Sequence, residues 1–378
     1  MKRKRLFMLI CVILFILFLY NGFVIIKNKR INNYTKDMTY YFRTVLENNA
    51  YMTNIPSDSV INFYVDESKK CKNDAEFLNL LIEANKSFGE AGHLYPLTPC
   101  DYFDRLYTFE YIIKKGLINQ NSTLYTDLNK NEIKKVYNSV CDEFSCDKKE
   151  IKKNKLQQKT EFLDNNLKFE HIKDTLFICI KTFEIEYIEE DMQKIHQELE
   201  KFEGNRIVFD IRGNNGGSEL YYISLVSMTS YDDYSYMLKT YGHGDVLTKY
   251  LKENENNLDI DIKDESIIIK DSREIKSIKE FDFDNIYILA DKYTASSADS
   301  FVKFAKETNY AKVVGLDTNG SGGASMDSLT FELPNTHFII QLEPTTTKPR
   351  KVKPDIYSYA QTLKDFYHDI LIYEKNFY

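Results

Sequence analysis

The segment DKYTASSADSF, residues 291–301, places three hydroxyl residues between the apolar run NIYILA and a helical pattern that ends near Thr308. Ser296 or Ser297 would therefore lie at a helix N-terminus, where a serine can simply cap the helix. The same position suits a nucleophile, because free amides and the helix dipole favour a developing oxyanion. The segment has no G-x-S-x-G elbow, and spacing alone favours the cap.

A second segment, DIRGNNGGSEL (residues 210–220), also joins a buried strand to a helix. Its glycines and asparagines permit backbone conformations that other residues resist, and consecutive N–H groups in such a turn can converge on an anion. A phosphate loop is excluded by the missing G-K-[ST] ending. The glycine cluster alone favours an ordinary tight turn without a ligand. A third segment, GLDTNGSGGASMD (315–327), is either a loop over a cleft or a mobile glycine hairpin.

Six histidines could supply a base for such a nucleophile: His93, His171, His196, His243, His337 and His368. His196 lies off the apolar face of an amphipathic helix. His93 follows a glycine in a loop before prolines, a place where a scaffold presents functional groups.

The elements around these segments alternate between strands and helices. Strands are expected over 174–183, 206–210, 285–290, 311–315 and 337–343, and helices over 189–204, 219–228 and 296–308. This order predicts a mostly parallel or mixed α/β sheet over residues 170–345. Residues 61–88 and 101–165 favour helices, whereas 231–280 has the pattern of a charged, irregular excursion.

The net charge of −7 over 378 residues argues against nucleic acid as the main partner. Leu6 to Ile26 form a run of 21 residues without a charge after MKRKR, which is long enough to span a bilayer. The basic flank predicts that residues 1–5 stay inside and the remainder is exported. A cleaved signal peptide is the alternative, but no A-x-A-like site follows the run.

Five cysteines lie outside this apolar run, and export would permit disulfides among them. Cys141 with Cys146, and Cys71 with Cys100, are possible pairs, whereas Cys179 fits a buried strand. All of them being unpaired is an equally open alternative. No C-x-x-C pair is present, so the sequence predicts no zinc or redox motif, and no metal or cofactor.

Four segments in a fixed order resemble the C-terminal processing peptidases (tail-specific proteases), a family that includes the tricorn protease core. They are DIRGNNGG, ASSADSF, VVGLDTNGSGG and KVKPDI, spread over residues 170–358. The resemblance implies a crotonase-like mixed-sheet α/β core. It implies that Ser296 is the nucleophile, and that Ser297 N–H with an amide of Gly216 or Gly217 forms the oxyanion hole.

The resemblance also narrows the choice of base. One branch of the family uses a lysine 25 residues after the serine, but Ser321 stands there. The tricorn-like branch uses a histidine from the N-terminal helical region, which matches His93. In that branch a neighbouring serine or threonine and a glutamate before the G-V-x-P-D motif orient the imidazole. Here Leu94 follows the histidine, no acid lies near Lys348, and Glu343 is the nearest upstream acid.

The sequence thus predicts a single-pass, membrane-anchored, extracytoplasmic serine peptidase that acts on polypeptides. Its expected parts are a basic flank and anchor (1–29), a tether (30–60), a helical region without a clear peptide-binding PDZ module (61–169) and a peptidase core (170–378). Two other functions remain open. A relative that has lost hydrolysis would bind peptides or apolar ligands, and an anchored structural protein would not need the serine at all.

Overall fold

The computed structural model describes residues 28–116, 119, 123–156, 166–254, 259–263, 266–283, 285–320 and 328–377. The expected apolar span, Leu6 to Ile26, lies outside these ranges. Within them, none of the helices has both the length and the apolar character that crossing a membrane requires.

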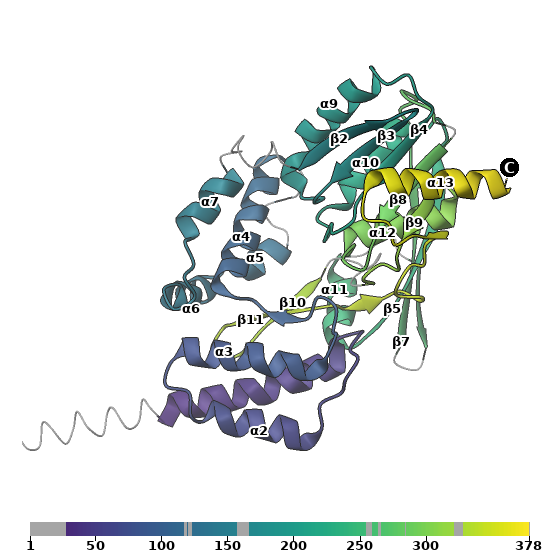
Figure 1. Cartoon of the computed structure of the whole chain (residues 1–378). Coiled ribbons are helices and arrows are strands. Elements are labelled where there is room, and N and C mark those ends of the chain that lie inside the picture. The colour runs from purple at the N-terminus through teal and green to yellow at the C-terminus, as the bar shows by residue number, and fades with distance from the viewer. Residues whose placement is uncertain are drawn as a thin grey trace, which may run out of the picture.

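A six-stranded mixed sheet forms the centre of the second half of the chain (Figure 1). Its strand order is β13-β9-β8-β4-β3-β2, and all neighbours are parallel except the β2–β3 hairpin. The strands are β2 (Leu167–Ile172), β3 (Thr175–Ile180), β4 (Arg206–Asp210), β8 (Asn285–Ala290), β9 (Lys312–Gly315) and β13 (Ile356–Tyr357). The predicted mixed α/β sheet is confirmed.

Helices cover both faces of this sheet, as the alternation of buried side chains requires. Ile178, Phe209 and Ile288 point to the face that carries α9 (Ile188–Leu199), α10 (Glu219–Thr229) and α12 (Ser297–Thr308). Their chain neighbours, such as Phe177 and Val208, point to the face that carries α13 (Leu363–Phe377). The sheet is therefore buried on both sides, which explains its nearly continuous apolar strands.

The segment over 231–280 differs from the irregular excursion that the sequence predicts. It contains β5 (Tyr234–His243), α11 (Asp245–Asn254), β6 (Asp259–Lys263) and β7 (Ser266–Ile275), and the strands form a sheet of order β12-β5-β7-β6 with β12 (Thr345–Thr346). Exposed and covered residues alternate along β5. The exposed positions of β5 carry both polar residues, Ser235 and Lys239, and an apolar one, Met237, so the strand lacks a clear apolar–polar alternation in the sequence.

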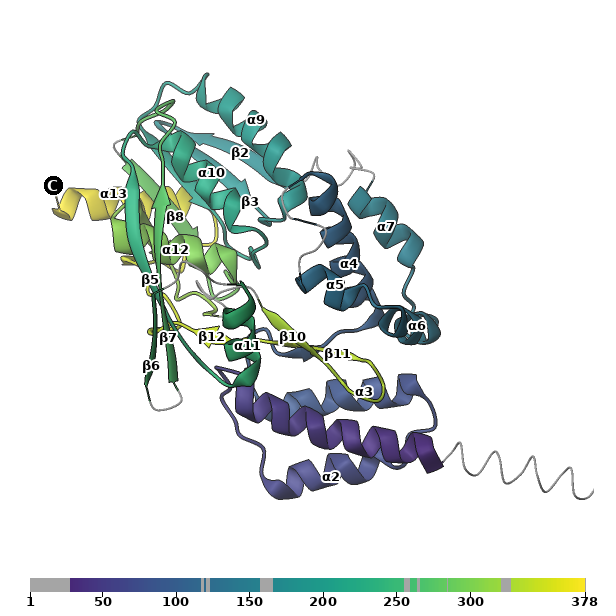
Figure 2. The same cartoon turned by 180° about the vertical axis from the view of Figure 1, so that it is seen from behind.

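The N-terminal region is helical and packs against a small three-stranded sheet (Figure 2). The sheet has the order β1-β11-β10, with β1 (Tyr95–Pro96), β10 (Leu329–Glu332) and β11 (Ile339–Leu342). The helices are α2 (Asp58–Ser68), α3 (Asp74–Asn85), α4 (Pro99–Lys114), α5 (Thr123–Leu128), α6 (Asn131–Val140) and α7 (Lys148–Leu156). Between 99 and 156 the described residues form helices and turns only, so this part shows no strands of a PDZ module.

A further helix over 28–48 occupies much of the expected tether. Tyr34, Met38 and Tyr41 on this helix are fully buried in the N-terminal core, which explains why the segment is not a free linker. Asp37, also fully buried, accepts hydrogen bonds from the backbone N–H groups of Asn335 and Thr336 in the β10–β11 turn. The first helix is thereby fixed to a hairpin some 300 residues later in the chain.

The five cysteines in the described part of the chain are all free thiols. Cys146 N–H donates to the carbonyl of Cys141 at 3.0 Å, so these two residues are close neighbours in one turn. Neither pair considered from the sequence is a disulfide in this structure.

Candidate active site

The predicted chemical segments meet because the sheet is parallel. β4, β8 and β9 run in the same direction, so the turns after Asp210, Ala290 and Gly315 leave the same edge of the sheet. Hydrogen bonds hold these turns together: Ala295 N–H donates to the Asn214 carbonyl at 3.0 Å, and Asn319 N–H donates to the Thr294 carbonyl at 2.9 Å. This edge is the usual place for a site in an open α/β sheet.

Ser296 stands at the start of α12 in a strained backbone conformation. Its φ of 53° and ψ of −129° lie in a region that non-glycine residues rarely adopt, at a cost of about 1–3 kcal/mol. Its side chain makes no capping hydrogen bond. The helix-cap interpretation of this serine is therefore not supported, and the residue is partly exposed at the turn.

Gly216 packs directly against this serine. A Cβ atom at Gly216 would lie 2.6 Å from Ser296 Cβ and 3.0 Å from Ser297 N, and the φ of Gly216 is +101°. The structure thus brings Ser296, Ser297 and Gly216 together. Only glycine fits at this position, both because of the close approach and because of its backbone conformation.

The two glycines of the turn, Gly216 and Gly217, differ in their backbone hydrogen bonds. Gly216 N–H donates to the side-chain oxygen of buried Asn214 at 2.9 Å, and the Gly216 carbonyl accepts a hydrogen bond from Phe183 N–H. Gly217 N–H and Ser297 N–H make no hydrogen bond to any residue in the described ranges. Two backbone donors therefore remain unused beside the serine turn. A Cβ at Gly217 would collide with the backbone of Phe183, so Gly217 packs closely against the segment that follows β3.

His93 lies in the turn before β1 and is paired with Glu343 at the end of β11. The distance from His93 Nδ1 to Glu343 Oε2 is 3.2 Å, and His93 backbone N–H donates to the same oxygen at 2.8 Å. The antiparallel pairing of Tyr95 with Gln341 brings these distant segments into register. A carboxylate on Nδ1 holds the proton there and leaves Nε2 as the basic nitrogen.

Glu343 is fully buried, and its surroundings keep it charged. Burial raises the pKa of this carboxyl, but hydrogen bonds from His93 and Arg350 and the charge of Arg350 outweigh burial, so its pKa lies below the usual range. The Glu343 backbone N–H donates to Asn49 Oδ1 at 2.9 Å, which fixes the backbone at Glu343. Sequence reasoning considered this glutamate but could not assign it. An acid that directly follows the apolar strand FIIQL is the signal that could have identified it.

Asp299, one turn into α12, is a second buried carboxyl near the serine. Burial raises its pKa to about 7, although Thr318, Lys303 and Arg350 each act in the opposite direction. Neither of its carboxyl oxygens has a hydrogen-bond partner of good geometry in the described part of the chain. At neutral pH the group is therefore poised between its two protonation states.

His93 belongs to one cluster and Ser296 to another, and the two residues are not hydrogen-bonded to each other within the described residues. Arg350 links the clusters, because it pairs with Glu343 and its charge also acts on Asp299 of the nucleophile helix. In serine hydrolases without bound substrate such a bond is often long and forms only in the complex.

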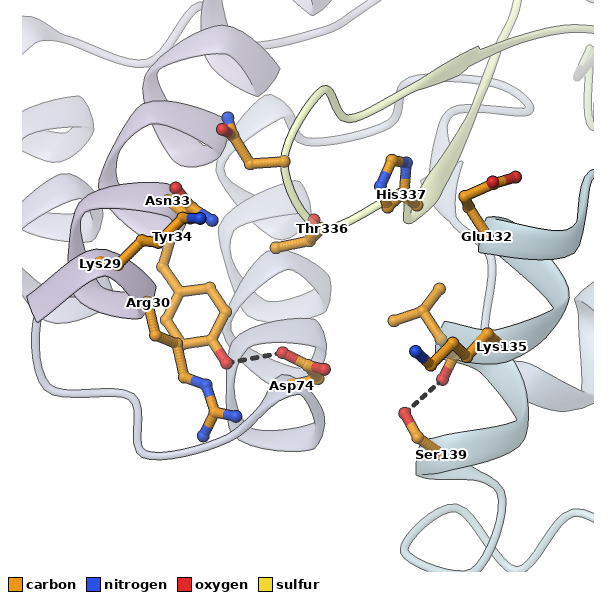
Figure 3. A pocket seen from close by; sticks show the side chains of 12 residues that line it. Lys29, Arg30, Asn33, Tyr34, Asp74, Glu132, Lys135, Ser139, Thr336 and His337 are labelled. Atoms are coloured by element: carbon orange, nitrogen blue, oxygen red, sulfur yellow. Dashed lines mark hydrogen bonds between the residues drawn. The ribbon is translucent and has the colours of Figure 1, made fainter. Parts of the chain in front are cut away.

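Two cavities among the described residues lie elsewhere. The larger, about 540 Å³, opens between the helix over 28–48, α3 and α6, under the turn that contains Thr336 and His337 (Figure 3). Lys29, Arg30 and Lys135 face it from two sides. A second, of about 310 Å³, lies beside α11 and β10. Neither contains a predicted site residue, so we locate the candidate site from residue chemistry rather than from cavity size.

Comparisons with known proteins agree with this geometry. Residues 174–357 match the model of Peptidase family S41. A candidate peptidase from Parabacteroides merdae superposes with a TM-score of 0.51 at 15% identity, over 89% of this chain and 92% of that one. A lipoprotein from Streptococcus agalactiae gives 0.46 at 15% identity, over 86% and 92%. The photosystem II D1 C-terminal processing protease gives 0.37 at 16% identity, over 51% and 48%.

The first of these structural likenesses shows a shared fold, and the other two are too weak to carry weight. No curated protein sequence matches the chain significantly. The family match covers the glycine turn, the serine turn and the K-V-K-P-D-I segment in their order. The predicted resemblance is thereby confirmed, as is the prediction of a serine-type peptidase at the level of the family: residues 174–357 of this chain match peptidase family S41.

Proposed function

We propose that this protein hydrolyses peptide bonds through an acyl-enzyme, with Ser296 as nucleophile and His93 as base. The contact between His93 Nδ1 and the buried Glu343 carboxylate carries the proposal. It supplies the orienting acid that the sequence left unassigned. The strained backbone of Ser296, which has no capping role, supports the assignment of the nucleophile.

The proposed reaction follows from these positions. His93 Nε2 takes the Oγ proton as Ser296 attacks the substrate carbonyl, and the resulting oxyanion lies against Ser297 N–H and an amide of the Gly216–Gly217 turn. Of the two glycines, Gly217 has the unused N–H. His93 then protonates the leaving amine, and water resolves the acyl-enzyme by the same steps in reverse. Glu343 stabilises the imidazolium while it exists.

The crotonase-like character of the core and the location of the protein are parts of the same proposal. The parallel sheet with α9, α10 and α12 on one face supports the former. The uncharged run Leu6–Ile26 after MKRKR supports a single-pass anchor with the peptidase outside the cytoplasm. We infer a polypeptide substrate from the family.

A fluorophosphonate probe tests the nucleophile, because it reacts only with an activated serine. We expect one adduct on the purified full chain, located at Ser296 by mass spectrometry and absent from Ser296→Ala. Ser297→Ala is the matched control and should still be labelled, because alanine keeps the backbone N–H, and the Ser297 hydroxyl is buried without a hydrogen-bond partner among the described residues. A folded wild-type protein that takes no label would contradict the proposal and favour a binding protein that has lost hydrolysis.

A further inference from the structure

Arg350 occupies a central position between the two clusters of the candidate site. Its Nη1 contacts Glu343 Oε1 and donates to Thr346 Oγ1 at 2.9 Å. The guanidinium lies 3.6 Å from the ring centroid of Tyr51, and the side chain is only 13% exposed. The guanidinium thus has three partners, Glu343, Thr346 and Tyr51, which together fix its position relative to the Glu343 carboxylate.

Glu343 divides its two oxygens between two partners. Oε2 meets the His93 imidazole and the His93 backbone N–H, whereas Oε1 meets Arg350. An arginine on one oxygen fixes the rotation of the carboxylate, so the other oxygen is aimed at the imidazole. A carboxyl that is 1% exposed would otherwise favour its neutral form.

The charge of Arg350 also acts on the nucleophile helix. Its charge reaches Asp299, whose other charged neighbour on α12 is Lys303. Gly320 packs on the backbone of residue 350, at 3.1 Å from the place where a Cβ would lie. The loop after β9, which also bonds the serine turn through Asn319, therefore rests on the segment that carries Arg350.

Building on the proposed function, we propose that Arg350 is a positioning residue for the reaction: it holds Glu343 as an oriented carboxylate, and thereby holds His93 with its proton on Nδ1 and Nε2 free to accept the serine proton. Arg350 does not touch the reacting atoms. It acts through Glu343, and through it on His93.

The proposal predicts a characteristic pH dependence. Glu343 contributes to activity as an anion, so activity is lost as pH falls through its folded-state pKa, which Arg350 and His93 hold down against burial. Removing Arg350 raises that pKa, so the acid limb of the rate profile should move to higher pH. The other charged groups that face this network are Asp299 and Lys303.

The first experiment measures the rate of fluorophosphonate labelling at Ser296 against pH for wild type, Arg350→Gln and Arg350→Lys. We expect Arg350→Gln to shift the acid limb and lower the rate 10-fold or more at neutral pH, and Arg350→Lys to restore part of both. Arg273→Gln is the matched control, because Arg273 is an equally ion-paired arginine bonded to Glu219 and Asp271. It should leave the limb unchanged. Repeating the measurement in an Asp299→Asn background tests whether Asp299 is the source of the shift; a shift that persists there belongs to the Glu343–His93 pair.

A second readout does not depend on peptidase activity. In protein labelled with ¹⁵N-histidine, the His93 signals, identified by their loss in His93→Gln, report which ring nitrogen carries the proton. We expect Nδ1–H in wild type and a reduced Nδ1–H population in Arg350→Gln. An unchanged tautomer together with an unchanged acid limb would overturn the role of Arg350. If the wild-type protein fails to label but Arg350→Gln still has a smaller Nδ1–H population than wild type, the peptidase proposal is contradicted and the positioning role of Arg350 is retained.

Discussion

The two halves of the candidate site are built in different ways. The nucleophile half, residues 210–217 and 291–301, consists of two short turns at one sheet edge, and close packing of Gly216 on Ser296 defines it. The base half joins His93 to Glu343, which are 250 residues apart, through a side-chain contact and a short strand pairing. Local backbone geometry determines the first half, whereas long-range hydrogen bonds determine the second.

The two buried carboxyls show the same contrast in their charge. Glu343 receives hydrogen bonds from His93 and Arg350, and its pKa is lowered. Asp299 lacks a well-formed partner among the described residues, and burial raises its pKa to about 7. Equal burial thus has opposite outcomes, because a buried acid stays ionised only where donors surround it.

The largest effect should come from the base half. Glu343→Gln keeps the size of the side chain but removes the charge that stabilises the imidazolium, so we expect the labelling rate at Ser296 to fall about 10³–10⁴-fold. Glu332→Gln is the control, since Glu332 also pairs with a histidine, His337, at 2.6 Å. If both variants label alike, the Glu343–His93 contact has no catalytic role.

In the nucleophile half, Gly216→Ala should prevent the serine turn from forming. The added methyl meets Ser296 Cβ at 2.6 Å on a backbone with φ of +101°, so we expect labelling to fall about 10²-fold or more and unfolding free energy to fall by about 2 kcal/mol or more. At Gly213, with φ of +73°, an added Cβ meets nothing within 4 Å. Gly213→Ala should cost about 1 kcal/mol and keep labelling. Equal losses in the two variants would contradict the packing argument.

Asp299 should make stability depend on pH in the opposite sense from Glu343. Its folded-state pKa lies above its unfolded value, so the folded protein binds more protons and loses stability as pH rises from about 4 to about 7, by a few kcal/mol. Denaturant unfolding at several pH values checks this. Asp299→Asn should remove that slope, and the same slope in the variant would show that Asp299 is not its source.

The smallest effect concerns the strain at Ser296. Glycine adopts its backbone angles readily, so Ser296→Gly should be more stable than Ser296→Ala by about 1–2 kcal/mol. Both variants lack the hydroxyl, which makes the comparison independent of activity. Equal unfolding midpoints in chemical denaturation would show that the turn is not strained.

Sequence reasoning was more effective for the nucleophile half for a physical reason. Glycine turns and a serine at a strand-to-helix boundary are local patterns, so the positions of both turns could be predicted together with β4, β8 and α12. The roles of Ser296, Ser297, Gly216 and Gly217 came from the family resemblance of those segments. The partners of His93 are set by β1–β11 pairing and could not be read from spacing. The helix over 28–48 was also missed, because a mixed polar segment hides the one face that it buries.

The central claim is that a histidine from the N-terminal region activates a serine at the edge of the central sheet. The most direct measurement compares fluorophosphonate labelling rates at Ser296 for wild type, His93→Ala and His171→Ala, where His171 pairs with Glu198 on the surface, outside the candidate site. We predict a loss of 10²-fold or more for His93→Ala alone. Equal labelling of all three folded proteins would contradict the pairing of the two halves and require a different base.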